Sequence, residues 1–144
     1  MYSVLILWAP DSTENRRIVD AVSRVFDELK TTTVVKLAAE ATIADVSATE
    51  IVLFGVEKSG SAELPPEYTE WVRVFKGITL AGRTAGFFSM GSEKATARLR
   101  KALKDTEIAQ RDHDPLFVDS RQADMSEWAR KLVSGHREMK NGRS

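Results

Sequence analysis

Residues 8–16 read Trp8-Ala9-Pro10-Asp11-Ser12-Thr13-Glu14-Asn15-Arg16, and they join two different sequence patterns. The residues before them, Val4 to Trp8, form a short apolar run that is typical of a buried strand. After them, apolar side chains recur at helical spacing from Ile18 to Leu29. The stretch is therefore predicted to be the turn between a strand and a helix, where parallel α/β proteins commonly hold a phosphate.

The rest of the chain repeats this alternation of strand and helix. The predicted strands are residues 2–8, 31–37, 51–54, 85–88 and 115–118, with helical patterns between them and after the last. Parallel neighbours need crossover connections, and helices that make these crossovers cover both faces of the sheet. The sequence therefore predicts an α/β fold, a three-layer α/β/α sandwich around a five-stranded parallel sheet.

Length and composition set the outer limits of the interpretation. A chain of 144 residues forms one ordinary domain, predicted to span residues 1–135, followed by a polar, frayed tail at residues 136–144. We expect a cytoplasmic protein without a membrane segment, because the sequence has neither a long apolar run nor a cationic-then-apolar leader. The absence of cysteine excludes disulfides, thiolate metal sites and cysteine nucleophiles.

Charge is balanced overall but divided along the chain. The 21 basic and 21 acidic residues cancel, yet residues 1–72 hold six bases and twelve acids, so the halves carry about −6 and +6. Solvated helix faces explain most of this asymmetry, although it can also steer a charged partner. The basic run from Lys94 to Lys104 spirals around its predicted helix without interleaved aromatic residues, and we expect no nucleic-acid binding.

The segment Gly55-Val56-Glu57-Lys58-Ser59-Gly60-Ser61-Ala62-Glu63-Leu64-Pro65 resembles the second flavin loop of the flavodoxin family. Gly55, Gly60, Glu63 and Leu64 fall at matching spacing. The order of elements over residues 1–135 is also similar to that of short-chain flavodoxins. This resemblance implies the strand order 2-1-3-4-5 and a ligand crevice at the carboxyl ends of strands 1, 3 and 4.

The first loop departs from the family pattern Thr/Ser-x-Thr-Gly-x-Thr, which surrounds the phosphate of flavin mononucleotide (FMN). The matching cofactor-binding positions are Pro10, Asp11, Ser12, Thr13, Glu14 and Asn15. Pro10 has no amide proton to donate, and Thr13 replaces the glycine that permits close approach of the backbone. Asp11 and Glu14 bring negative charge to an anion site, which Arg16 and Arg17 offset only if they turn inward.

The acids also have an explanation that needs no ligand. Asp11 is predicted to be the N-cap of the helix, with Glu14 as its acidic partner three residues later. The flavin-ring positions are degraded as well, because Ser59 stands where the family usually has an aromatic residue. No aromatic residue follows in the third loop, Ser89-Met90-Gly91-Ser92-Glu93-Lys94. No bound cofactor is therefore expected; if one binds, the resemblance implies FMN, with Ser12, Ser59, Gly60 and Ser89 among its contacts.

Other chemical sites find little support in the sequence. His113 lies between Asp112 and Asp114, but three consecutive side chains of an extended segment do not converge on a metal, and no metal site is predicted. No catalytic residue is identified, and nucleotide-binding glycine motifs are missing. The three tryptophans are expected in the core, with Trp8 placed where it could instead project into the crevice.

These observations lead to one functional hypothesis and one alternative. The hypothesis is a flavodoxin-like domain with lost or weakened FMN binding that acts at the former flavin crevice. There it would contact a protein partner, redox or basic in character, or another small ligand. The alternative is an FMN-binding electron carrier of the flavodoxin type, in which the flavin supplies the chemistry.

Overall fold

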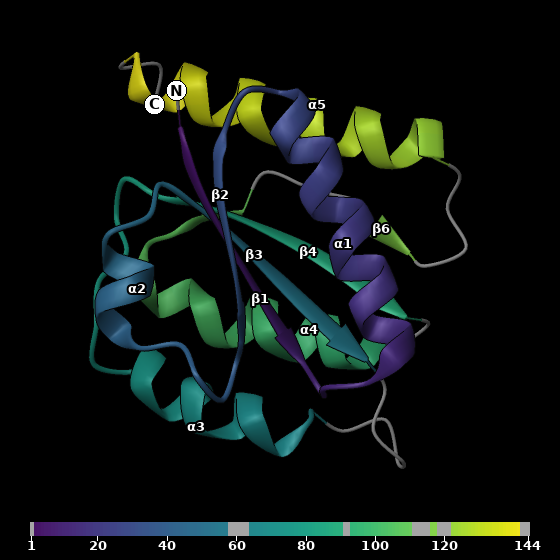
Figure 1. Ribbon diagram of the computed structural model, residues 1–144. Helices are drawn as coiled ribbons and strands as arrows, with labels where there is room; N and C mark the ends of the chain where they lie inside the picture. Colours follow the sequence, from purple (N-terminus) through teal and green to yellow (C-terminus); the bar gives the residue numbers. More distant parts are fainter. Residues whose placement is uncertain (1, 58–63, 91–92, 111–115, 118–121, 142–144) are drawn as a thin grey trace.

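The computed structural model describes residues 2–57, 64–90, 93–110, 116–117 and 122–141. Strands and helices alternate along the chain, as the sequence predicts (Figure 1). The elements are β1 (Ser3–Ala9), α1 (Thr13–Glu28), β2 (Thr32–Leu37), α2 (Ile43–Ser47), β3 (Ile51–Glu57), α3 (Pro66–Phe75), β4 (Thr84–Met90), α4 (Glu93–Leu103), the 3₁₀ helix η1 (Lys104–Thr106), β5 (Ala109–Gln110), β6 (Leu116–Phe117) and α5 (Gln122–Lys140).

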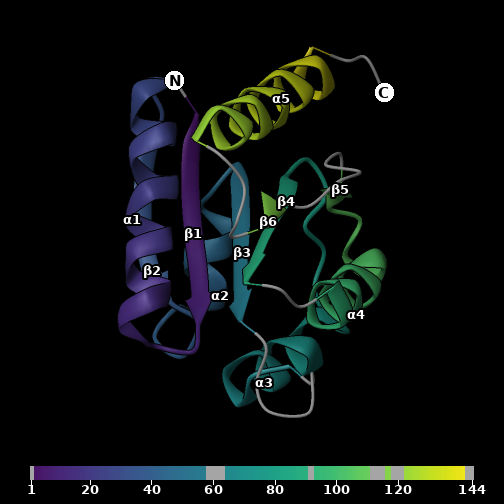
Figure 2. The same cartoon turned by 90° about the vertical axis from the view of Figure 1, so that its right-hand side faces the viewer.

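The strands form one parallel sheet of order β2-β1-β3-β4-β5, which confirms the predicted order. Helices α1 and α5 cover one face, and α2, α3 and α4 cover the other (Figure 2). The last strand differs from the prediction of a single segment at residues 115–118. Strand β6 lies within that range and pairs with the carboxyl half of β4, whereas the unpredicted β5 pairs with the amino end of β4.

The central strands are buried on both faces, so their side chains divide between two cores. Leu5 and Leu7 of β1 point toward α3 and α4, while Ile6 and Trp8 point toward α1 and α5. The first core holds many aromatic rings, and Phe54 stacks on Phe87 with ring centroids 5.6 Å apart. Burial of these rings stabilises the packing of α3 and α4 on the sheet.

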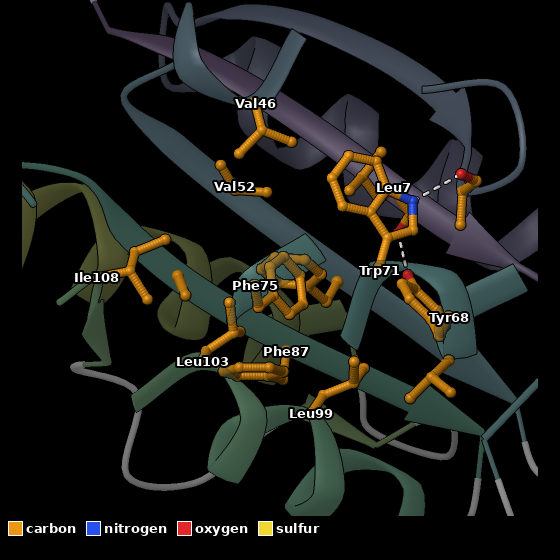
Figure 3. Close-up of a cluster of buried hydrophobic side chains, with 14 of the residues drawn as sticks. Leu7, Val46, Val52, Tyr68, Trp71, Phe75, Phe87, Leu99, Leu103 and Ile108 are labelled. Atoms are coloured by element: carbon orange, nitrogen blue, oxygen red, sulfur yellow. Dashed lines mark hydrogen bonds between the residues drawn. The ribbon is translucent and has the colours of Figure 1, made fainter. Parts of the chain in front are cut away.

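Two polar groups in this core are satisfied by backbone carbonyls (Figure 3). The Tyr68 hydroxyl lies 2.9 Å from the carbonyl oxygen of Gly55 and 3.1 Å from that of Leu7, so it can donate to either. The Trp71 indole nitrogen donates to the carbonyl of Ala38 at 2.8 Å. Burial raises the pKa of the Tyr68 phenol well above its usual value. Helix α3 is thereby fixed to the carboxyl ends of β1 and β3.

The expected frayed tail from residue 136 is wrong for its first residues, because α5 continues to Lys140. His136 is fully buried at the amino end of the sheet. Its Nδ1 and the Thr84 hydroxyl are hydrogen-bonded at 2.8 Å, and its Nε2 lies 3.4 Å from a Glu50 carboxylate oxygen. The ring of Tyr2 meets the imidazole edge to face at 4.9 Å. These tertiary contacts carry the helix past Gly135, a residue of low helix propensity.

Helix α1 ends in a left-handed residue that is not glycine. Lys30 has φ of 61°, and its amide donates to Asp27 while the amide of Thr31 donates to Phe26. This pair of bonds is the Schellman arrangement, which usually places glycine at the left-handed position.

None of the described helices combines the length and the apolar composition that a bilayer crossing requires.

Candidate functional site

The register of the sheet brings the predicted loops to one edge. Ala9 of β1 pairs with Val56 of β3, and Val56 pairs with Ser89 of β4. The carboxyl ends of the three strands therefore lie side by side, as the predicted crevice requires. Ser59 and Gly60, two of the predicted contacts, lie outside the described residues, as does His113 with its acidic neighbours.

The turn between β1 and α1 is closed by Ser12. Its backbone is extended, with φ of −145° and ψ of 158°, and its hydroxyl oxygen accepts a hydrogen bond from the Asn15 amide at 3.1 Å. Ser12 is therefore the N-cap, and the prediction that Asp11 caps the helix is wrong. Glu14 is exposed in the first turn, where its charge still suits the positive end of the helix dipole.

Asp11 is engaged by an arginine instead of by the helix amides. Arg16 donates two hydrogen bonds to its carboxylate, from Nε to Oδ1 at 2.8 Å and from Nη2 to Oδ2 at 3.0 Å. These bonds lower the pKa of the Asp11 carboxyl, because they favour its ionised form. One of the two arginines that could offset the acidic turn is thus already paired with one of its acids.

Asn15 completes the turn from inside. The residue is 6% exposed, and its side-chain amide donates to the carbonyl oxygen of Pro10 at 2.7 Å. The family pattern has a hydroxyl residue at this position, whereas here the amide bonds to the turn itself. Pro10 has no N–H, and the Asn15 side chain bonds inward, so these two positions of the turn offer few donors to a ligand.

Substituting the cap should affect stability more than substituting the exposed acid beside it. We expect Ser12→Ala to lower the free energy of unfolding by about 0.5 to 2 kcal/mol, because the Asn15 amide loses its acceptor. Asp11→Ala should change it much less, since it removes only an exposed ion pair. Urea denaturation of both variants measures the difference, and a larger loss for Asp11→Ala would contradict the assignment.

Trp8 lies in the core and does not project into the crevice. Its side chain is 6% exposed and packs in the core layer beneath α1, with the Arg16 guanidinium 5.7 Å from its ring centroid. Strand alternation explains this, because Trp8 shares a face with Ile6. Beside it lies a shallow hollow of about 410 Å³, lined by Trp8, Arg16, Val35, Lys36, Leu37 and Glu40.

Gly55 has a packing role that the resemblance did not indicate. It pairs with Phe88 across β3 and β4, and the Phe88 ring lies directly over it. A Cβ at this position would come within 2.5 Å of Phe88 Cε2. The glycine at the end of β3 thus makes room for an aromatic ring.

Among the described residues, no cluster of three or more His, Asp or Glu side chains could hold a metal ion.

No protein-family model and no curated protein sequence matches this chain. Solved structures do match: a short-chain flavodoxin associated with a non-canonical PDU bacterial microcompartment superposes with a TM-score of 0.80 at 13% identity, covering 94% of this chain and 99% of that one. Flavodoxin 2 from Bacillus cereus superposes with a TM-score of 0.80 at 19% identity, covering 92% of this chain and 99% of that one. A Fusobacterium nucleatum flavodoxin bound to flavin mononucleotide gives 0.77 at 10% identity, covering 94% and 99%. The fold is therefore flavodoxin-like.

Proposed function

We propose that this flavodoxin-like domain has lost or greatly weakened FMN binding and works through a protein partner or another small ligand at the carboxyl-end crevice. The observation that carries the proposal is the self-contained β1–α1 turn. Its hydroxyl caps the helix, its buried amide bonds to the Pro10 carbonyl, and its nearest arginine is paired with Asp11. These groups are already engaged within the turn, which supports the loss or weakening of phosphate binding.

The charge of the turn strengthens this argument. An FMN phosphate placed there would meet the ionised carboxylate of Asp11, whose pKa is already lowered by Arg16. Like charges repel, and Glu14 adds a second, exposed carboxylate to the same turn. Thr13 adds a side chain where the family pattern has glycine. The negative charge of the turn and the Thr13 side chain both disfavour binding of the FMN phosphate.

Titration of free FMN with the purified protein, followed by flavin fluorescence, tests the proposed loss of FMN binding. We expect no stoichiometric change at micromolar FMN for the wild type. The double variant Asp11→Ser with Thr13→Gly should bind FMN at least tenfold more tightly, since it frees Arg16 and opens the backbone. Asp27→Ser removes an acidic side chain at the other end of α1. It is the matched control and should not alter FMN binding.

A wild-type protein that takes up one FMN at micromolar concentration would contradict the loss of binding and favour the alternative, an FMN-binding electron carrier.

A separate experiment tests the proposed contact with a protein partner. Glu14 is exposed in the first turn of α1 and Glu40 is exposed on the wall of the hollow, and both give this edge a negative field suited to a basic or redox partner. Glu14→Lys should reduce capture of a partner from the native extract, whereas Glu28→Lys, at the far end of the same helix, should not. Equal capture by both would place the partner elsewhere.

A further inference from the structure

Strand β2 forms an edge of the sheet with apolar side chains exposed on it. Among the described residues it pairs only with β1. Val34 is 47% exposed and Val35 is 40% exposed; with Ile43 of α2, they are the exposed large hydrophobic side chains of the described chain. Consecutive residues of a strand point to opposite faces, so this edge is apolar on both sides of the sheet.

The hydrogen-bonding groups of this edge can be assigned from its pairing with β1. The amide of Thr32 donates to the carbonyl of Tyr2, just before β1, and that of Ala38 donates to the carbonyl of Trp8 in β1, at 2.9 Å in each case. Backbone groups alternate in direction along a strand, so the N–H and C=O groups of Thr33 and Val35 point away from β1. The edge thus presents a row of backbone donors and acceptors beside exposed valines.

The usual features that prevent edge pairing are missing from β2. The strand contains neither proline nor glycine, and its register with β1 is unbroken from Thr32 to Leu37. Its one charged residue, Lys36, lies 3.0 Å from the Asp45 carboxylate of α2, which neutralises the cation. Edge strands of soluble proteins are normally protected by free charges, proline or bulges.

We propose that β2 pairs with β2 of a second copy of this chain, in antiparallel orientation about a twofold axis normal to the sheet. Such an axis keeps each face on the same side, so residues can pair only in registers centred on a residue. A register centred on Val34 places Val34 opposite its equivalent, Thr33 opposite Val35, and Thr32 opposite Lys36. Thr33 and Val35, whose backbone groups point outward, then form the hydrogen-bonded pairs.

The charge and shape of the β2 edge favour this register, and they favour a second copy of the chain as the partner. Centring on Val35 would place Lys36 opposite the apolar Val34, whereas centring on Val34 places Lys36 opposite Thr32 and pairs β-branched residues at the centre. Residues 16–45 around the edge contain five bases and five acids, so two copies approach without net repulsion. The whole chain has zero formal net charge, which also permits self-association. The edge is therefore complementary to itself.

Single cysteines test the register, because the natural chain has none. In the proposed dimer the two Val34 positions form a non-hydrogen-bonded pair with Cα atoms about 4.5 Å apart, within the range of a disulfide. Val34→Cys should therefore give a covalent dimer under mild oxidation. Thr32→Cys is the control: its two copies would lie about 14 Å apart along the strands, so it should remain monomeric on a denaturing gel. Equal cross-linking of both variants would overturn the register.

Sedimentation velocity over a concentration series tests the dimer itself. The wild type should show reversible dimerisation. Val34→Lys should weaken it at least tenfold by placing two cations at the axis, and Val35→Pro should do so by removing an outward N–H that β1 does not use. Ile43→Lys makes the same charge change at an exposed position off the strand, and it should leave the dimer intact. A wild type that stays monomeric at submillimolar concentration, or equal effects of Val34→Lys and Ile43→Lys, would overturn the proposal.

Discussion

Replacing His136 by alanine is expected to lower the free energy of unfolding by roughly 2 to 5 kcal/mol. The imidazole is fully buried, so its removal leaves a cavity beneath α5. It also removes the hydrogen-bond partner of the buried Thr84 hydroxyl and the group beside the Glu50 carboxylate. Urea denaturation followed by circular dichroism measures the loss.

Two variants separate the causes of this effect. His136→Phe keeps most of the ring volume and the contact with Tyr2 but removes the hydrogen bonds, so it should lose less than His136→Ala. Lys140→Ala removes an exposed side chain of the same helix that lies 4.0 Å from Glu50, and it should change stability by less than about 0.5 kcal/mol. An unchanged denaturation midpoint for His136→Ala would show that the end of α5 does not contribute to the folded domain.

Gly55→Ala is expected to cost about 1 to 3 kcal/mol of stability, the usual range for overpacking a core. The new methyl group would overlap the Phe88 ring, which is 4% exposed and packs near Trp128 with ring centroids 6.3 Å apart. A rigid ring in a filled core has little space into which it can move. Thermal or urea denaturation gives the size of the effect.

Gly77→Ala provides the matched control, because a Cβ at that position has no atom within 4 Å. Its expected change is within about 0.5 kcal/mol. If both variants unfold at the same urea concentration, the ring of Phe88 can move away from Gly55 without cost. That result would contradict the packing role of this glycine.

Much of the fold could be predicted because its signals are local and strong. The apolar run 51–54 identifies a strand buried on both faces, and the helical spacing from Ile18 to Leu29 identifies α1. Strand order came from the resemblance to flavodoxins rather than from these patterns. The two-residue strand β5 is too short to show any periodicity. His136 was missed because a histidine after a glycine gives no local sign of burial; only contacts with distant residues such as Thr84 hold it in place.

The turn between β1 and α1 was located correctly, but its internal bonding was not predicted. The sequence placed the turn at residues 9–15 and assigned the N-cap to Asp11, although the neighbouring Ser12 is an equally suitable residue type. Which of them caps the helix depends on the backbone entering the turn and on Arg16, whose reach back to Asp11 has no signature in composition. The inward bond of the Asn15 amide to Pro10 likewise depends on the folded turn.

The left-handed lysine at the end of α1 shows that this chain lies below the stability its backbone allows. A side chain in that conformation costs roughly 1 kcal/mol, and Glu107, with φ of 67°, is a second such residue. Both positions lie in short connections, where glycine fits the existing backbone without strain. A chain carrying Lys30→Gly would therefore be a more robust background in which severely destabilised variants remain folded long enough to be purified and compared.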